Sequence, residues 1–171
     1  MKTSSTSARA SKVTATRIAC GVVLAAAFAG TAAKVQAHHS FSIFDSSKTR
    51  VFTGVVTRVN PDVNHLQIFF AVMNEERKNV IRDDKGQPII WAVEMGGSAQ
   101  SAREGISVTE FAPGTIMSVA LHPLRSGEPA GSREGSLFKC PAKTPPAAGK
   151  HCDSVEGSIR IGNGPLPTPT T

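Results

Sequence analysis

Residues 51–59 read VFTGVVTRV, and this stretch decides the fold class of the chain. β-branched residues occupy every second position of it, at Val51, Thr53, Val55, Thr57 and Val59. Because β-branched side chains favour strands and alternate positions share one face of a strand, the stretch predicts a β-strand. Asn60-Pro61-Asp62 ends this strand, since proline cannot donate a hydrogen bond to a neighbouring strand and Asn and Asp favour turns.

Similar short apolar stretches, separated by turn signals, follow along the chain. They predict further strands at residues 66–73, 88–95, 115–121, 135–140 and, as a short return, 156–161. A charged hairpin tip is expected at 74–85, a turn region at 125–132, and one short helix at 98–105, which has a serine available as N-cap and a glycine placed to stop it. Five or six short strands with one helix after the third predict a mainly β protein. We expect a small antiparallel barrel, closed or nearly closed, that resembles an oligonucleotide/oligosaccharide-binding (OB) barrel.

The first 37 residues have the layout of a secretory signal peptide. A basic, Ser/Thr-rich start runs to Arg17, an apolar run follows from Ile18 to Ala33, and Val35-Gln36-Ala37 is a small-residue cleavage site. The apolar run is shorter than the roughly 20 residues that span a bilayer, so a retained membrane anchor is the weaker alternative. Cleavage after Ala37 would give an exported protein that begins at His38 and carries no membrane anchor.

The formal net charge of +6 belongs almost entirely to this first segment. It holds five of the 19 basic residues and no acidic residue, which leaves 14 basic against 13 acidic residues in the remainder. No basic run remains there, and Trp91 and the phenylalanines do not alternate with arginines as a base-stacking surface would require. The composition therefore argues against nucleic acid as a partner.

The rest of the chain is expected to form one domain, residues 38–161. Cys140 and Cys152 make an even pair in an exported chain, and a disulfide between them is the expected state. The alternative, a metal site made of Cys140, His151 and Cys152, lacks CxxC spacing and offers neighbouring ligands that converge poorly on one ion. Residues 162–171, GNGPLPTPTT, are Pro-rich and polar and predict a disordered tail.

Several of these stretches match a known family in order and spacing. The chain resembles a family of small exported bacterial proteins of unassigned function, whose mature chains begin Ala-His-His-Ser-Phe. The matching residues are Ala37 to Phe41 with Phe44-Asp45, Gly54-Val55-Val56 followed by Asn60-Pro61, Trp91 to Gly96, and Leu121 to Arg125 with Gly127. The resemblance implies a β-rich domain that is periplasmic or secreted, and it implies no established activity.

One departure from the family pattern concerns a histidine. The family has His directly after Asn-Pro, whereas this chain continues Asp62-Val63-Asn64 before it reaches His65. Either His65 fills that position after a three-residue insertion, or the role of that histidine is lost here.

The expected mature N-terminus offers a metal site. A terminal His38 chelates a metal through its α-amine and its imidazole, and His39, His65 or His122 would supply a further nitrogen. Nitrogen ligands in a plane suit Cu(II), so copper is the first metal expected and zinc the second. If cleavage came one residue earlier, Ala37-His38-His39 would form a different square-planar copper arrangement. The alternative is that the terminal histidines, His38 and His39, are solvated, or hydrogen-bond to backbone carbonyls and hold the leader, residues 38–50 before the first strand, against the barrel.

Three residues stand out as candidates for binding a ligand: Trp91, Glu94 and Arg125. Trp91 and Glu94 fall on opposite faces of the expected strand 88–95. Glu94 beside a histidine would be a general base; the alternative is that it faces solvent or pairs with an arginine such as Arg125. Arg58 and Arg103 join Arg125 as candidates for holding an anion.

The chain contains no GxSxG, HExxH, P-loop or dinucleotide-binding motif. The leading interpretation is therefore a non-enzymatic, exported β-barrel domain that binds a periplasmic partner or a small ligand. The alternative is a copper-binding protein that uses the amine and imidazole of His38 with a second histidine, as a carrier or an oxidative enzyme.

Overall fold

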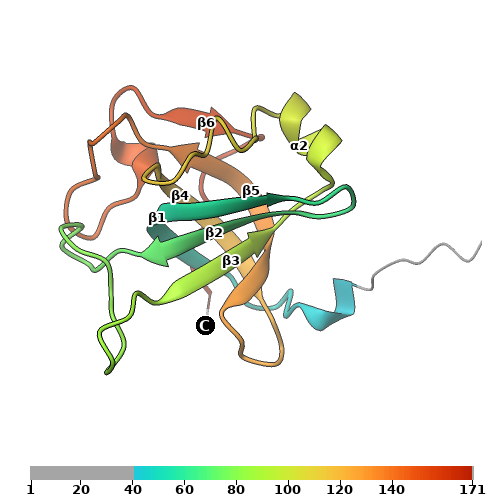
Figure 1. Cartoon of the computed structure of the whole chain (residues 1–171), viewed down its shortest axis with the longest axis horizontal. Helices are drawn as coiled ribbons and strands as arrows, with labels where there is room; N and C mark the ends of the chain where they lie inside the picture. Colours follow the sequence, from blue (N-terminus) through green and yellow to red (C-terminus); the bar gives the residue numbers. More distant parts are fainter. Residues whose placement is uncertain (1–40, 171) are drawn as a thin grey trace, which may run out of the picture. The chain divides into compact units, whose positions relative to one another are not determined.

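The structure is a computed structural model that describes residues 41–170, and these residues are mainly β (Figure 1). The strands are β1 (Arg50–Pro61), β2 (Leu66–Val72), β3 (Ile90–Glu94), β4 (Ile116–Pro123), β5 (Ala130–Lys139) and β6 (Ile159–Ile161). The helical segments are η1 (Phe41–Ile43), α2 (Ser98–Arg103) and η2 (Cys152–Ser154). Among the described residues, no helix is both long and apolar enough to span a membrane.

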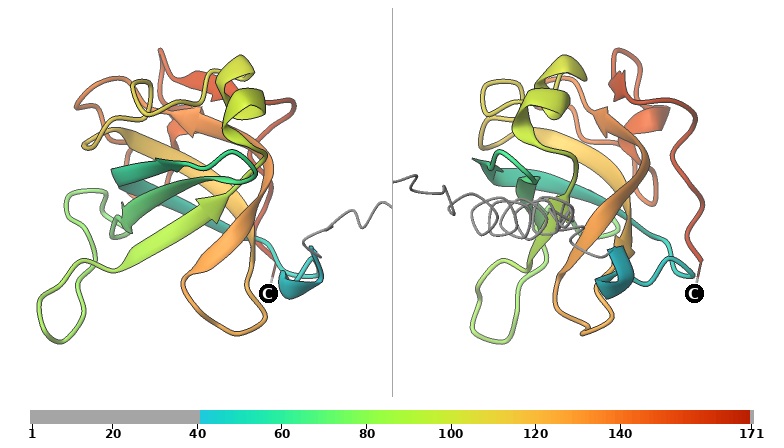
Figure 2. Two further views of the ribbon diagram at one scale, coloured as in Figure 1. Left: turned by 45° about the vertical axis from the view of Figure 1, so that its right-hand side comes forward. Right: turned by 90° about the vertical axis from the view of Figure 1, so that its right-hand side faces the viewer.

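Five of the strands close into a barrel, and β6 adds to the outer edge of β5 (Figures 1 and 2). The sheet runs β3-β2-β1-β4-β5-β6, and a further pairing of β3 with β5 closes the ring. With α2 between β3 and β4, the mainly β fold and its likeness to an OB barrel are confirmed.

The expectation of a wholly antiparallel barrel is wrong at the closing pair. β3 and β5 run parallel, from Ala92 opposite Ala130 to Glu94 opposite Ser132, while all the other neighbours are antiparallel. The reason is geometric, because a closed ring with an odd number of strands cannot reverse direction at every step. This pairing also explains why β5 begins at Ala130, inside the stretch that the sequence predicts to be a turn.

A β-bulge in β1 changes which residues face the barrel interior. Val56 lies opposite Phe70 and Arg58 opposite Phe69, so Thr57 is an extra residue on β1. Val56 is buried in the core before the bulge, and Val59 packs against the core after it. The alternation of β-branched residues predicts the strand correctly, but the core-facing set does not follow that alternation.

The helix and the C-terminal segment also differ from expectation. Helix α2 has Gly97, and not a serine, as its N-cap. Residues 162–170, for which the sequence predicts disorder, lie against the barrel instead. Leu166 packs beside the disulfide, and the backbone N–H of Thr170 donates to the carbonyl of Thr49 at 3.0 Å. The contact between Thr170 and Thr49 joins residues more than a hundred positions apart, which local composition does not reveal.

Candidate functional site

Trp91 and Arg125, two of the three predicted ligand-binding residues, line the same pocket. It lies where β1 begins and β4 ends, and its volume is about 140 Å³. We call it the rim pocket and define it by Trp91 and its five charged residues, Asp45, Lys48, Arg50, Arg125 and Glu128. The structure thus brings together side chains from the leader, from β1, from β3 and from the β4–β5 loop.

Trp91 forms the aromatic part of the rim pocket. Its side chain lies on the inner face of β3, is 9% exposed, and packs on Phe52 with ring centroids 4.6 Å apart. The guanidinium carbon of Arg50 lies 5.4 Å from the centre of the Trp91 ring. This is a cation–π contact, which holds the charged group of Arg50 over the aromatic face.

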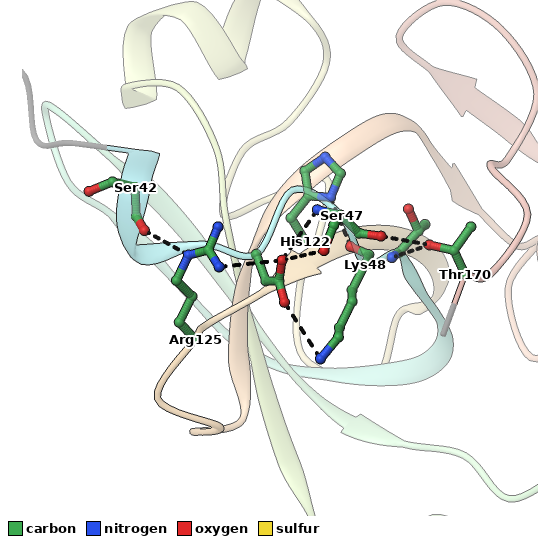
Figure 3. A network of polar contacts seen from close by, with 8 residues as sticks. Ser42, Ser47, Lys48, His122, Arg125 and Thr170 are labelled. Carbon is green, nitrogen blue, oxygen red and sulfur yellow. Dashed lines mark hydrogen bonds and ion pairs between the residues drawn. The ribbon is translucent and has the colours of Figure 1, made fainter.

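Asp45 organises two of the three cations of the pocket (Figure 3). One carboxylate oxygen lies 3.6 Å from Nη1 of Arg125 and the other 3.5 Å from Nζ of Lys48. The hydroxyl of Ser47 donates to Asp45 at 2.6 Å. This hydrogen bond is the main cause that lowers the pKa of Asp45, and the charges of Arg125 and Lys48 lower it further. Asp45 therefore stays ionised and its charge is shared between two cations.

The leader is fixed to the β4–β5 loop at the same place. The guanidinium Nε of Arg125 donates to the carbonyl of Ser42 at 3.0 Å (Figure 3), and its backbone N–H donates to the carbonyl of Ile43 at 2.9 Å. Phe44 is buried and forms a β-bridge with Leu124. Arg125 therefore lines the rim pocket and also anchors the leader, which contributes Asp45 and Lys48 to the lining.

His122, a predicted metal ligand at the end of β4, contacts a backbone carbonyl of the leader. Its Nδ1 donates to the carbonyl of Lys48 at 2.9 Å and lies 3.6 Å from a carboxylate oxygen of Glu134. Glu134 in turn accepts a hydrogen bond of 2.6 Å from the hydroxyl of Thr49. In the described structure His122 therefore helps to hold the leader against β4.

His65 and Glu94 come together in a second pocket, of about 210 Å³. Nδ1 of His65 lies 3.0 Å from one carboxylate oxygen of Glu94, and the amide of Gln67 lies 3.4 Å from the other. The suggested pairing of Glu94 with Arg125 is wrong, because Arg125 pairs with Asp45. The side chain of Arg133 also lines this pocket, and it forms an ion pair of 2.7 Å with Glu104.

The metal hypothesis receives no site from the described residues. Within residues 41–170, no group of three or more His, Cys, Asp or Glu side chains is arranged to hold a metal ion. His65 and His122 contact different carboxylates, as given above. The other two proposed ligands, His38 and His39, lie outside the described residues, as does the expected signal peptide.

The predicted disulfide between Cys140 and Cys152 is confirmed. Because the two sulfurs are bonded to each other, the alternative metal site built from these thiols and His151 is excluded in this state. The disulfide loop covers the outer face of β1. There the hydroxyl of Thr53 lies 2.8 Å from Nδ1 of His151 and 2.7 Å from the hydroxyl of Ser118.

His151 is a half-buried polar group whose local sequence does not mark it as a site of its own. Burial is the main cause that lowers its pKa, and the nearby charge of Arg77 lowers it further. A neutral imidazole fits its hydrogen bond to Thr53. The only sequence signal for this contact is the position of His151 beside Cys152. Arg50 was also missed, because nothing in its local sequence shows that it lies over Trp91.

The strand order, the helix position and the rim pocket define an OB-like barrel with a pocket of small-molecule size. The chain belongs to a family of unknown function (DUF6152), whose model matches residues 25–133. The matched range contains every residue that defines the rim pocket, and it ends before the disulfide loop. No curated protein and no solved structure matches the chain.

Proposed function

We propose that this chain is an exported, non-enzymatic binding module that holds a small ligand in the rim pocket. The observation that carries the proposal is the convergence of Arg50, Trp91 and Arg125 on one cavity, since polar groups that converge on a cavity beside an aromatic ring are typical of ligand sites. The leader and the β4–β5 loop are tied to each other, so this pocket is formed before a ligand arrives.

The size of the rim pocket limits the ligand. An apolar cavity of about 150 Å³ binds benzene, and the rim pocket has about 140 Å³. It therefore accepts one ring or a group of that size, either as a whole small molecule or as one end of a longer ligand. It is too small to enclose a nucleotide.

Export is supported by two independent features. Residues 1–37 have the order of charges, apolar residues and small residues that a signal peptide requires. The disulfide between Cys140 and Cys152 forms and persists in oxidising compartments such as the bacterial periplasm. On this proposal the ligand is a compound that is available outside the cytosol.

Trp91 supplies a direct test, because it is the only tryptophan of the chain. The test uses a panel of ring-sized fragments that includes anionic, neutral and cationic members, added one by one to the exported protein. We expect at least one of them to change the fluorescence of Trp91 in a saturable way. Amide resonances in a ¹H–¹⁵N spectrum should then move around Trp91 and Arg125, and much less around Glu94 in the second pocket. If no fragment of the panel moves the resonances around the rim pocket, the proposal is wrong.

Copper binding by the mature N-terminus is the second candidate function. One observation favours copper binding. The hydrogen bonds from Arg125 to the carbonyls of Ser42 and Ile43 fix the chain a few residues after His38 and His39. We expect the intact mass of the exported protein to correspond to a chain that starts at His38, and to increase by one copper ion under native conditions. Replacing His38 by alanine should remove the increase. An unchanged native mass after addition of Cu(II) would exclude this candidate.

A further inference from the structure

We infer that the ligand of the rim pocket is a small anion, a carboxylate on a flat apolar body, and that Arg50 is the residue that binds its negative charge. The inference rests on the proposed function, since it names the chemical class of the ligand for the same pocket.

Of the three cations in the rim pocket, one is not paired with a carboxylate of the described residues and is available to a ligand. Asp45 is shared between Lys48 and Arg125, at 3.5 and 3.6 Å. Glu128, the other acidic residue of the pocket, accepts a hydrogen bond from the hydroxyl of Ser126 at 3.3 Å. Across residues 41–170, the guanidinium of Arg50 has no ion pair. With three cations and two carboxylates, the pocket carries an excess of one positive charge.

The position of Arg50 suits a carboxylate. Its guanidinium carbon lies 5.4 Å from the centre of the Trp91 ring, so one side of the group is supported by the indole. A guanidinium presents its N–H groups in a planar fork, and a carboxylate accepts two of them in parallel. Holding the fork over a buried ring reduces the freedom that a flexible arginine would otherwise lose when it binds an anion.

Charged residues form most of the lining, and the apolar part of the wall is where a flat apolar body would lie. Pro123 and Leu124 line the pocket beside the Trp91 ring, and neither offers a side-chain polar atom. The volume of about 140 Å³ accommodates one ring. A ring-sized anion would therefore place its carboxylate on Arg50 and its apolar body between Trp91 and Leu124. A cation of the same size would meet an excess of one positive charge, which disfavours its binding.

The test compares three probes that share one ring and differ in charge: benzoate, benzamide and benzylammonium. We expect benzoate to change the fluorescence of Trp91 saturably, and benzamide and benzylammonium to require at least tenfold higher concentration. Exported wild-type protein is used, with its disulfide intact. Equal affinity for benzamide, or tighter binding of benzylammonium, would overturn the anion inference while leaving a binding module in place.

Variants of Arg50 and of a control arginine then show which guanidinium binds the carboxylate of benzoate. Arg50→Gln removes the charge but keeps a long polar side chain, and we expect it to weaken benzoate binding about ten- to hundredfold, as for loss of a charged hydrogen-bonded pair. Arg50→Lys keeps the charge without the fork, and we expect an intermediate loss. Arg160→Gln, an exposed arginine of β6 outside the pocket, should leave binding unchanged. Thermal unfolding of each variant confirms that it is folded.

The outcomes separate the two proposals. If Arg50→Gln binds benzoate as wild type does, Arg50 is not the anion site and the inference is wrong. If none of the three probes binds while a fragment of the wider panel does, the ligand class is wrong and the binding function stands. If neither the three probes nor any fragment affects the rim pocket, both proposals are wrong.

Discussion

Replacing Phe70 by alanine is expected to lower the free energy of unfolding by about 3–5 kcal/mol, the usual cost of removing a fully buried phenylalanine. Phe70 lies on β2 with no exposed surface and belongs to the main core cluster. Its neighbourhood cannot easily close over the gap, because hydrogen-bonded strands form a ring around the core. Gly54 marks how closely β1 approaches: a Cβ added there would lie 2.5 Å from Cδ2 of Phe70.

The neighbouring residue provides the matched control. Phe69 has the same side chain, points to the other face of β2 and is partly exposed, beneath the guanidinium of Arg58 at 3.7 Å. Phe69→Ala is expected to cost about 1 kcal/mol, most of it the cation–π contact. Urea denaturation of the two variants measures the difference. If both variants lost the same free energy, the assignment of Phe70 to the interior of the barrel would be wrong.

This contrast between neighbouring residues shows which parts of the fold the sequence predicts. Alternation within a strand is local, so the strands around Val56, Phe70 and Val93 are predictable from residue types alone. The bulge at Thr57 and the parallel pairing of β3 with β5 are not, because both depend on the register between separate strands. The start of β5 at Ala130 was missed for the same reason: its first residues pair with β3, which is distant in the sequence.

In the candidate site, too, residue type is visible in the sequence, whereas contacts between distant segments are not. Trp91 and Arg125 stand out by residue type, and the structure places both in the rim pocket. Arg50 and Asp45 complete the pocket, but their roles come from contacts to residues about 40 and 80 positions away. Glu94 was correctly expected to oppose Trp91 across β3, yet its partner is His65, which only the pairing of β2 with β3 brings near.

The disulfide gives the other large effect. Replacing both Cys140 and Cys152 by serine is expected to lower the free energy of unfolding by about 3 kcal/mol. The disulfide restricts the conformations of the unfolded chain, and without it the unfolded state gains entropy. The two cysteines are 12 residues apart and both are buried, Cys152 completely. Urea denaturation of the double variant, and of wild type with and without a reductant, measures this loss, and the two comparisons should agree.

The loss of stability in the double variant should be concentrated where the disulfide loop contacts the barrel. The disulfide loop reaches the barrel through His151 on Thr53 and through Gly149, whose backbone N–H donates to the carbonyl of Glu75 at 2.9 Å. None of the residues that define the rim pocket belongs to this loop. At low urea the double variant should therefore lose amide protection around Thr53 and Glu75 and keep the fluorescence response of Trp91 to its ligand. A loss of free energy below about 1 kcal/mol would mean that packing of the loop, and not the cross-link, supplies its stability. A lost response of Trp91 in a folded variant would mean that the loop supports the pocket as well.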